Sequence, residues 1–222
     1  IYKLSQQAKK YVTVLLSGEG ADEVFGGYER FYDINFPFQT RRLLHEIKKN
    51  FKSPSAFVKY FNHESRAIMA TAFMTAEIAK KIRKSIKLDQ AIDSRISLYR
   101  NLSGSSFDRQ VKYEMCSYLP DLLVRQDKMS MAHSIENRVP FLDNEVVEKS
   151  FTLPEKYLLL KKSPEGYNTQ KYLLKKMTAN TFGKEFAFRE KMGFGIPVRE
   201  FFLNRIFFEY LNDKVLPGIK RR

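Results

Sequence analysis

The feature of this sequence that most restricts its fold is a short apolar run followed by a glycine-bearing turn. Residues 11–16 read YVTVLL, a β-branched pattern typical of a strand buried on both faces of a parallel sheet. Residues 17–23, SGEGADE, follow directly and are called the glycine turn here. Apolar residues at helical spacing then predict a helix over 24–32. The order is strand, turn and helix, which is the local unit of α/β proteins.

Most of the remaining sequence has helical periodicity. The predicted helices are 40–49, 54–62, 75–85, 88–101, 107–119, 121–133, 145–151 and 169–180. Pro120 suits the first turn of the helix that follows it, and 101–106, NLSGSS, predicts a loop. No second strand of comparable quality is visible, although one strand cannot form a parallel sheet by itself. The sequence therefore predicts a predominantly α-helical chain with one or few parallel strands.

Composition narrows the classes of partner. Lys and Arg total 39 against 25 Asp and Glu, and the net charge of +14 permits nucleic acid, acidic lipid or phosphorylated ligands. The basic residues come as scattered pairs rather than as one stripe, which is typical of solvated helix faces. No apolar run approaches the roughly 18 residues of a membrane-spanning helix, so no membrane partner is expected.

Cysteine and histidine usage offers no metal signature. Cys116 is the only cysteine, which excludes an intramolecular disulfide and a cysteine metal cluster. It lies in an apolar helical stretch and is expected to be a small core residue. His45, His63 and His133 are too widely spaced for a zinc site. A lone cysteine fits a reducing compartment, so a cytoplasmic location is expected.

The glycine turn is the strongest local signal of chemistry. Gly18 and Gly20 allow the backbone to approach a ligand closely, and the start of a helix favours an anion. Glu19, Asp22 and Glu23 add three carboxylates. These carboxylates suit Mg²⁺ or a cationic group at a phosphate site, and they equally suit capping of the helix start. The residues of the turn alone leave both interpretations open.

Two later segments carry further candidates. Residues 119–143, LPDLLVRQDKMSMAHSIENRVPFLD, place charges among apolar residues, and Asp121 and Arg125 are spaced to pair on one helix face. Residues 189–197, REKMGFGIP, predict a shaped loop that presents Lys191. A lysine there suits the neutralisation of negative charge that develops during a reaction. The alternative for this loop is a plain surface segment.

Together, SGEGADEVFGGY, RQDKMSMAHSIENRVPFLD and KMGFGIP resemble three C-terminal motifs of glutamine-dependent asparagine synthetases and their amidotransferase relatives. They occur in the family's order, and the resemblance runs from about residue 11 to about residue 202. It implies the C-terminal portion of an α/β pyrophosphate-loop ATPase domain, which is Rossmann-like. It also implies ATP-dependent amidation of a carboxylate, most simply aspartate to asparagine. In that reaction an acyl-adenylate is attacked by ammonia from glutamine.

The resemblance also implies roles for the residues of the glycine turn. Ser17, Gly18 and Gly20 match positions that contact ATP. Glu19 matches a carboxylate beside the adenylate and the incoming ammonia, where it can accept a proton. Asp22 matches the acid closest to Mg²⁺. The implied cofactors are therefore ATP and Mg²⁺.

Four further residues receive roles in the same way. Tyr28 matches a tyrosine that works with an acid as a base in the β-lactam-forming relatives. Arg125 and Lys128 match basic positions that face the nucleotide cleft. Lys191 matches the lysine that stabilises the adenylation transition state. We accordingly expect Glu19, Tyr28 and Lys191 to be catalytic.

The chain also departs from the family pattern. It contains no SGGxDS loop to hold pyrophosphate and no N-terminal cysteine for glutamine hydrolysis. Residues 1–222 are therefore expected to form a single partial domain that lacks its N-terminal glutaminase partner and is inactive alone. Relatives that amidate other carboxylates share the motifs, so the acceptor stays open, as does a homodimer. A basic helical module that binds nucleic acid and a degenerate relative kept for assembly are the alternative interpretations.

Overall fold

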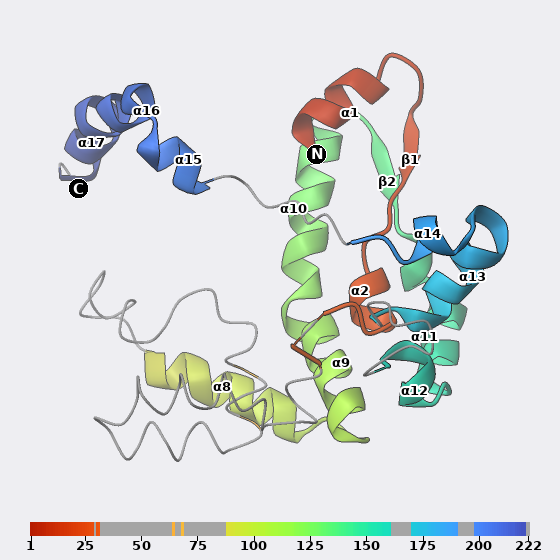
Figure 1. Ribbon diagram of the computed structural model, residues 1–222. Helices are drawn as coiled ribbons and strands as arrows, with labels where there is room; N and C mark the ends of the chain where they lie inside the picture. Colours follow the sequence, from red (N-terminus) through yellow and green to blue (C-terminus); the bar gives the residue numbers. More distant parts are fainter. Residues whose placement is uncertain are drawn as a thin grey trace. The chain divides into compact units, whose positions relative to one another are not determined.

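The computed structural model divides the chain into two compact units, Ile1–Phe188 and Arg189–Arg222 (Figure 1). The residues that the structure describes are 1–28, 30–31, 64, 68, 88–160, 170–190 and 198–220. The predicted helices 40–49, 54–62 and 75–85 lie outside them. The glycine turn lies in the first unit.

A two-stranded parallel sheet pairs segments that are far apart in the sequence. Strand β1 (Val14–Leu16) pairs with β2 (Glu136–Arg138), with Val14 opposite Glu136 and Leu16 opposite Arg138. A strand was predicted here, but it is shorter than 11–16, and Leu16 is 72% exposed. The expectation that it is buried on both faces is therefore wrong for the described residues. The second strand, ENR, went unpredicted because three polar residues give no apolar signal.

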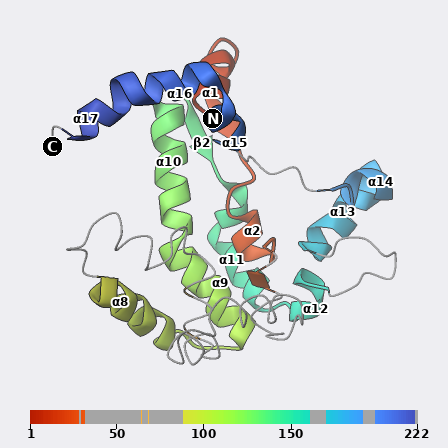
Figure 2. The same ribbon diagram turned by 60° about the vertical axis from the view of Figure 1, so that its left-hand side comes forward.

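Helix α10 (Leu119–Met131) lies beside this sheet and contacts β2 (Figures 1 and 2). The same helix contacts α1 (Tyr2–Ala8) and α9 (Ser106–Ser117). Pro120 stands in the first turn of α10 as predicted. A reciprocal pair of hydrogen bonds between Ser105 and Asp108 begins α9. These caps fix where the two helices start.

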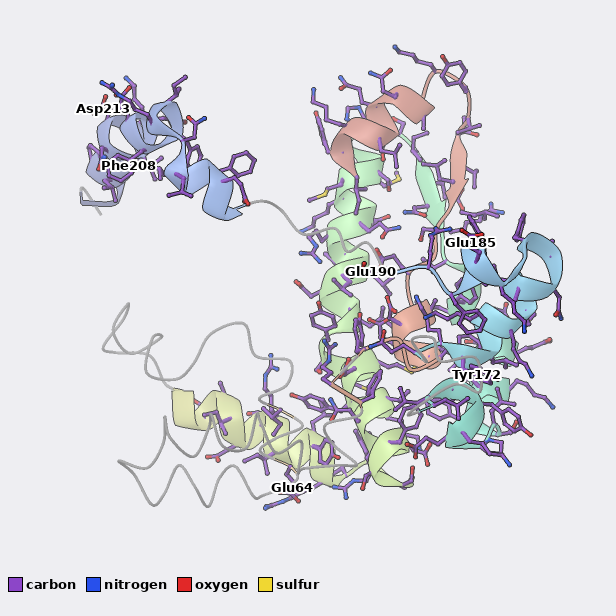
Figure 3. The ribbon with its side chains drawn as sticks, viewed as in Figure 1. Glu64, Tyr172, Glu185, Glu190, Phe208 and Asp213 are labelled. Atoms are coloured by element: carbon purple, nitrogen blue, oxygen red, sulfur yellow. The ribbon has the colours of Figure 1, made fainter. Side chains whose placement is uncertain are left out.

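The other helices of the first unit largely follow the predicted pattern. Helices α8 (Leu88–Arg100) and α11 (Asn144–Phe151) confirm two predictions, and 101–105 is non-helical as expected. Helix α13 (Tyr172–Phe182) begins and ends slightly later than predicted. The remaining elements are α12 (Glu155–Leu158), α14 (Lys184–Ala187) and the 3₁₀ turn η1 (Pro140–Leu142). Tyr172 lies at the start of α13 (Figure 3). Its side chain is buried, and its ring centroid lies 6.5 Å from that of Phe188.

The predicted helix 24–32 is confirmed only in part: α2 (Ala21–Val24) shares Val24 with it, residues 25–28 are not helical, and Arg30 and Phe31 are. Helix α2 begins inside the glycine turn and contains four residues, because Phe25 leaves the helical conformation. Its apolar side chains nevertheless enter the main core. That cluster consists of Val24, Phe25, Phe31, Phe107, Val111, Leu158 and Leu159. The core therefore anchors α2 against α9, whose buried face supplies Phe107 and Val111.

Cys116 is exposed on α9, which corrects the expectation of a core position. The buried face of this helix includes Gln110 and Glu114. At about 100° per residue, Cys116 is turned roughly 200° from Glu114 and so faces away from the core.

The second unit is a run of short helices. They are α15 (Val198–Leu203), α16 (Arg205–Tyr210), the π-helical turn η2 (Leu211–Val215) and α17 (Leu216–Lys220). Several of their large apolar side chains are exposed, among them Ile206 and Phe208. In the part of the chain that is described, no helix is both long enough and apolar enough to span a bilayer.

Candidate active site

The site is built where the carboxyl ends of β1 and β2 meet. The backbone N–H of Ser17 donates to the carbonyl of Arg138 at 2.9 Å, which extends the strand pairing by one residue. The N–H of Glu19 then donates to the Ser17 hydroxyl oxygen at 3.4 Å. In parallel sheets, ligands bind outside this edge of the strands. The three residues assigned to ATP, Ser17, Gly18 and Gly20, therefore lie at the edge that suits a ligand.

The two glycines of the turn have different surroundings. Gly20 has φ +85°, and a Cβ added there would stand 2.3 Å from Leu142 Cδ2. Gly18 is exposed, and a Cβ added there would meet nothing within 4 Å. Gly20 is thus required by the fold itself. Gly18 leaves the backbone open to a ligand.

Asp22 is held by a lysine that the sequence analysis did not single out. Lys171 Nζ lies 2.9 Å from Asp22 Oδ1, and each side chain is 26% exposed. Lys171 itself has φ +52°, an uncommon conformation for a residue with a side chain. No local pattern in the sequence marks Lys171, because its partner Asp22 lies far from it along the chain. A positive charge thus stands beside the carboxylate that was predicted to lie near Mg²⁺.

Glu23 turns into the core rather than toward the edge of the sheet. It is 1% exposed, and Tyr28 Oη donates to its Oε1 at 2.5 Å. Burial raises the pKa of the Glu23 carboxyl above its ordinary value, although the hydrogen bond from Tyr28 works the other way. Burial and the Glu23 carboxylate also raise the pKa of Tyr28. The Tyr28 hydroxyl is therefore a donor here, and its catalytic role stays a prediction.

Arg30 and Glu114 form a partly buried ion pair next to this hydrogen bond. Arg30 Nε donates to Glu114 Oε1 at 2.7 Å, and a second guanidinium nitrogen contacts Oε2. The Glu114 side chain is fully buried. Burial lowers the pKa of Arg30, but the hydrogen bond and charge of Glu114 outweigh it and raise that pKa overall. The guanidinium therefore stays charged.

The basic residues predicted for the nucleotide are not gathered at the glycine turn by any described contact. Arg125 and Lys128 are exposed on α10. Asp121 is exposed on the same helix, and within the described residues no ion pair joins it to Arg125. Lys191 lies outside the described residues, as does the rest of 191–197. The roles of these three basic residues stay predictions.

The carboxylates of the glycine turn decide which kind of magnesium site the turn could form. In the described ranges, no three His, Cys, Asp or Glu side chains come together to hold a metal ion. Glu23 is withdrawn into the core, which leaves Asp22 and Glu19 as partly exposed carboxylates. Mg²⁺ commonly takes one or two protein carboxylates and completes its shell with water and substrate phosphates. The turn fits that mode of binding and does not fit a metal site made of protein ligands alone.

Comparisons with known proteins agree with the three motifs. The family model described as Asparagine synthase matches residues 1–218. The glutamine-hydrolysing asparagine synthetase 1 of Bacillus subtilis (strain 168) is 30% identical over 93% of this chain and 34% of its own length. A protein of Mycobacterium tuberculosis (strain H37Rv), provisionally named a glutamine-hydrolysing asparagine synthetase, is 28% identical over 90% of this chain and 32% of its own. No solved structure matches the chain.

The relatives are much longer than the chain that matches them. The chain spans about a third of their length, and the match covers nearly all of the chain. The family model alone covers far more than half of the residues, including those on both sides of the glycine turn. This chain belongs to the asparagine synthase family.

Proposed function

We propose that the protein containing this chain uses ATP to convert a carboxylate to an amide, with aspartate as the acceptor and asparagine as the product. The acceptor carboxylate attacks the α-phosphorus of ATP, which forms the acyl-adenylate and releases pyrophosphate. Ammonia from glutamine then attacks the acyl carbon and expels AMP. Membership of the asparagine synthase family supports this reaction, and no described feature favours the nucleic-acid alternative.

The observation that carries the proposal is the position of the glycine turn at the carboxyl edge of the parallel strands. Ser17 and Gly18 stand there with open space above Gly18, which supports a role in the close approach of phosphates. Gly20 leaves room for Leu142 beside the turn, since a Cβ at residue 20 would stand 2.3 Å from Leu142 Cδ2. Glu19, partly exposed on the turn, would accept a proton from the attacking nitrogen.

Asp22 would bind Mg²⁺, which neutralises phosphate charge when it is bound. Within the chain, Lys171 supplies a positive charge 2.9 Å from the same carboxylate. We propose that this ammonium holds the Asp22 side chain in place before the metal arrives. Arg125, Lys128 and Lys191 would add positive charge around ATP, with Lys191 at the adenylation transition state.

The direct test is an exchange of labelled pyrophosphate into ATP, measured on the full-length protein with and without aspartate. We expect exchange that depends on aspartate and Mg²⁺, and release of AMP when glutamine or ammonia is added. If exchange depends on a different acid and not on aspartate, the proposed acceptor is wrong but the proposed reaction stands. No AMP with any carboxylate would overturn the proposal.

The same assay on this chain alone tests a second expectation. The chain has no SGGxDS loop, so we expect no aspartate-dependent exchange from residues 1–222. The full-length variant Lys191→Ala distinguishes an active synthetase from a degenerate relative kept for assembly. Loss of exchange in the variant is expected, and an inactive full-length wild type would favour the degenerate relative.

A further inference from the structure

A partly buried ion pair connects α9 to the segment that follows α2. Glu114 on α9 is fully buried, and Gln110 Nε2 donates to its Oε1 at 2.8 Å. Arg30 meets both oxygens of the same carboxylate in a fork. The planar guanidinium and the planar carboxylate allow few other arrangements, so this pair fixes orientation as well as distance.

The same guanidinium reaches α2 through an aromatic ring. The Arg30 Cζ lies 3.7 Å from the ring centroid of Tyr28 and 5.1 Å from that of Tyr118. Tyr28 in turn donates its hydroxyl to Glu23, the third residue of α2. A continuous series of contacts therefore runs from α9 through Arg30 and Tyr28 to the helix that ends the glycine turn.

Helix α2 depends on such contacts for its position. It has four residues, and its N-cap Gly20 offers no side chain to cap it. A single helical turn is unstable by itself in water, because nucleation costs more entropy than one or two hydrogen bonds recover. What holds α2 in place is tertiary contact, from Val24 and Phe25 in the core and from Glu23 in this series.

We propose that Arg30 and Glu114 are positioning residues for the glycine turn. By orienting Tyr28 and Glu23, they set where α2 lies against the edge of the sheet, and hence where Glu19 and Asp22 point. Only the expected effect of these residues on catalysis rests on the proposed function. The structural part of the proposal concerns the order of residues 17–25 and can be tested without any activity.

A partly buried ion pair suits positioning better than it suits stability. Removing the Glu114 carboxylate from water offsets much of its attraction to Arg30, and the fork between the two groups is demanding in geometry. The apolar cluster around Val24 and Phe107 already attaches α2 to α9. The ion pair fixes the orientation of α2 relative to α9, which apolar packing alone would leave free to rotate.

The first experiment measures hydrogen exchange on the full-length protein. Arg30→Lys keeps the charge but loses the fork, and Glu114→Gln keeps the shape but loses the charge. We expect amide exchange in residues 17–25 to quicken on the order of tenfold in both variants, with α10 protected as in the wild type. The control is Arg205→Lys, which alters an exposed ion pair with Glu209 in the second unit. It should leave residues 17–25 unchanged.

Two results would overturn the proposal. One is unchanged exchange in residues 17–25 in both variants. The other is loss of protection throughout the first unit, α10 included, in both variants, because the pair would then be a general structural support.

The second experiment measures pyrophosphate exchange by the full-length protein. We expect kcat to fall on the order of tenfold to a hundredfold in Arg30→Lys, with a much smaller change in the KM for ATP. If the wild type shows no exchange, the proposed function fails, and hydrogen exchange still decides the positioning role. If the wild type is active and the variants match it, the positioning proposal fails.

Discussion

Lys171 Nζ lies 2.9 Å from Asp22 Oδ1, and the backbone N–H of Lys171 donates to the carbonyl of Gly26 at 3.4 Å. One residue thus contacts the segment around α2 through both its side chain and its backbone. Both charged groups are about a quarter exposed, so water screens their attraction. The pair therefore holds Asp22 loosely, which suits the release of Asp22 to Mg²⁺ under the proposed function.

A double-mutant cycle tests how tightly the pair is held. Lys171→Met, Asp22→Asn and the double variant would be unfolded in urea. We expect a coupling free energy of about 1 kcal/mol or less, because the pair is partly exposed. A coupling above about 3 kcal/mol would instead mark a buried structural pair, from which Asp22 could not readily be released to Mg²⁺.

Gly20 and Gly18 offer a matched pair of substitutions. Gly20→Ala should lower the free energy of unfolding by about 1–3 kcal/mol, because φ is +85° and the new methyl group would meet Leu142. Gly18→Ala has open space and should change that free energy by less than about 1 kcal/mol. Denaturant unfolding of this chain measures both. Equal losses from the two variants would contradict the distinction between them.

Tyr28→Phe removes the hydroxyl that donates to Glu23. The buried carboxylate then loses a hydrogen bond, and we expect a cost of about 1–3 kcal/mol in the free energy of unfolding. Tyr11→Phe is the control, since Tyr11 is 84% exposed and should change stability by less than about 0.5 kcal/mol. A stability loss no larger than that of the control would mean that the Tyr28 hydroxyl is free for another role.

Glu23→Gln should change the pH dependence of stability. Burial raises the Glu23 pKa above its ordinary value of 4.5, so the folded state retains a proton that the unfolded state releases. The stabilisation is complete below pH 4.5 and is lost as pH rises through the folded pKa. Gln stays neutral and still accepts from Tyr28.

The stability of Glu23→Gln relative to wild type should therefore increase between pH 4.5 and 8. Thermal unfolding of both proteins across that range measures the difference. A difference that stays constant with pH would show that the Glu23 pKa is not raised. A difference that shrinks with rising pH would show that it is lowered.

Local patterns predicted the parts of the fold whose signals are local. Apolar spacing and a well-placed proline indicated α8, α10 and α11 to within two residues. The strand β2 escaped prediction because its three polar residues owe their conformation to pairing with β1. The prediction that Cys116 is a core residue was wrong, because the apolar residues around it do not indicate which face of α9 is buried.

In the candidate site, too, local features could be predicted from the sequence and long-range contacts could not. The glycine turn was visible in the sequence because glycine spacing and carboxylates are local features. Lys171, Arg30 and Glu114 were not, since each acts on a partner distant in the chain. Nothing in single-sequence periodicity joins an arginine at 30 to a glutamate at 114. Only packing brings them together.

The pairing of Val14 with Glu136 has a consequence for synthesis on the ribosome. The glycine turn leaves the ribosome before β2, because the strand that completes its edge is translated more than 100 residues later. At about 5–20 residues per second, the turn waits roughly 6–25 s for its partner strand. During that interval the edge of β1 that pairs with β2 is open, which exposes an apolar segment of the nascent chain to aggregation or to capture by a chaperone.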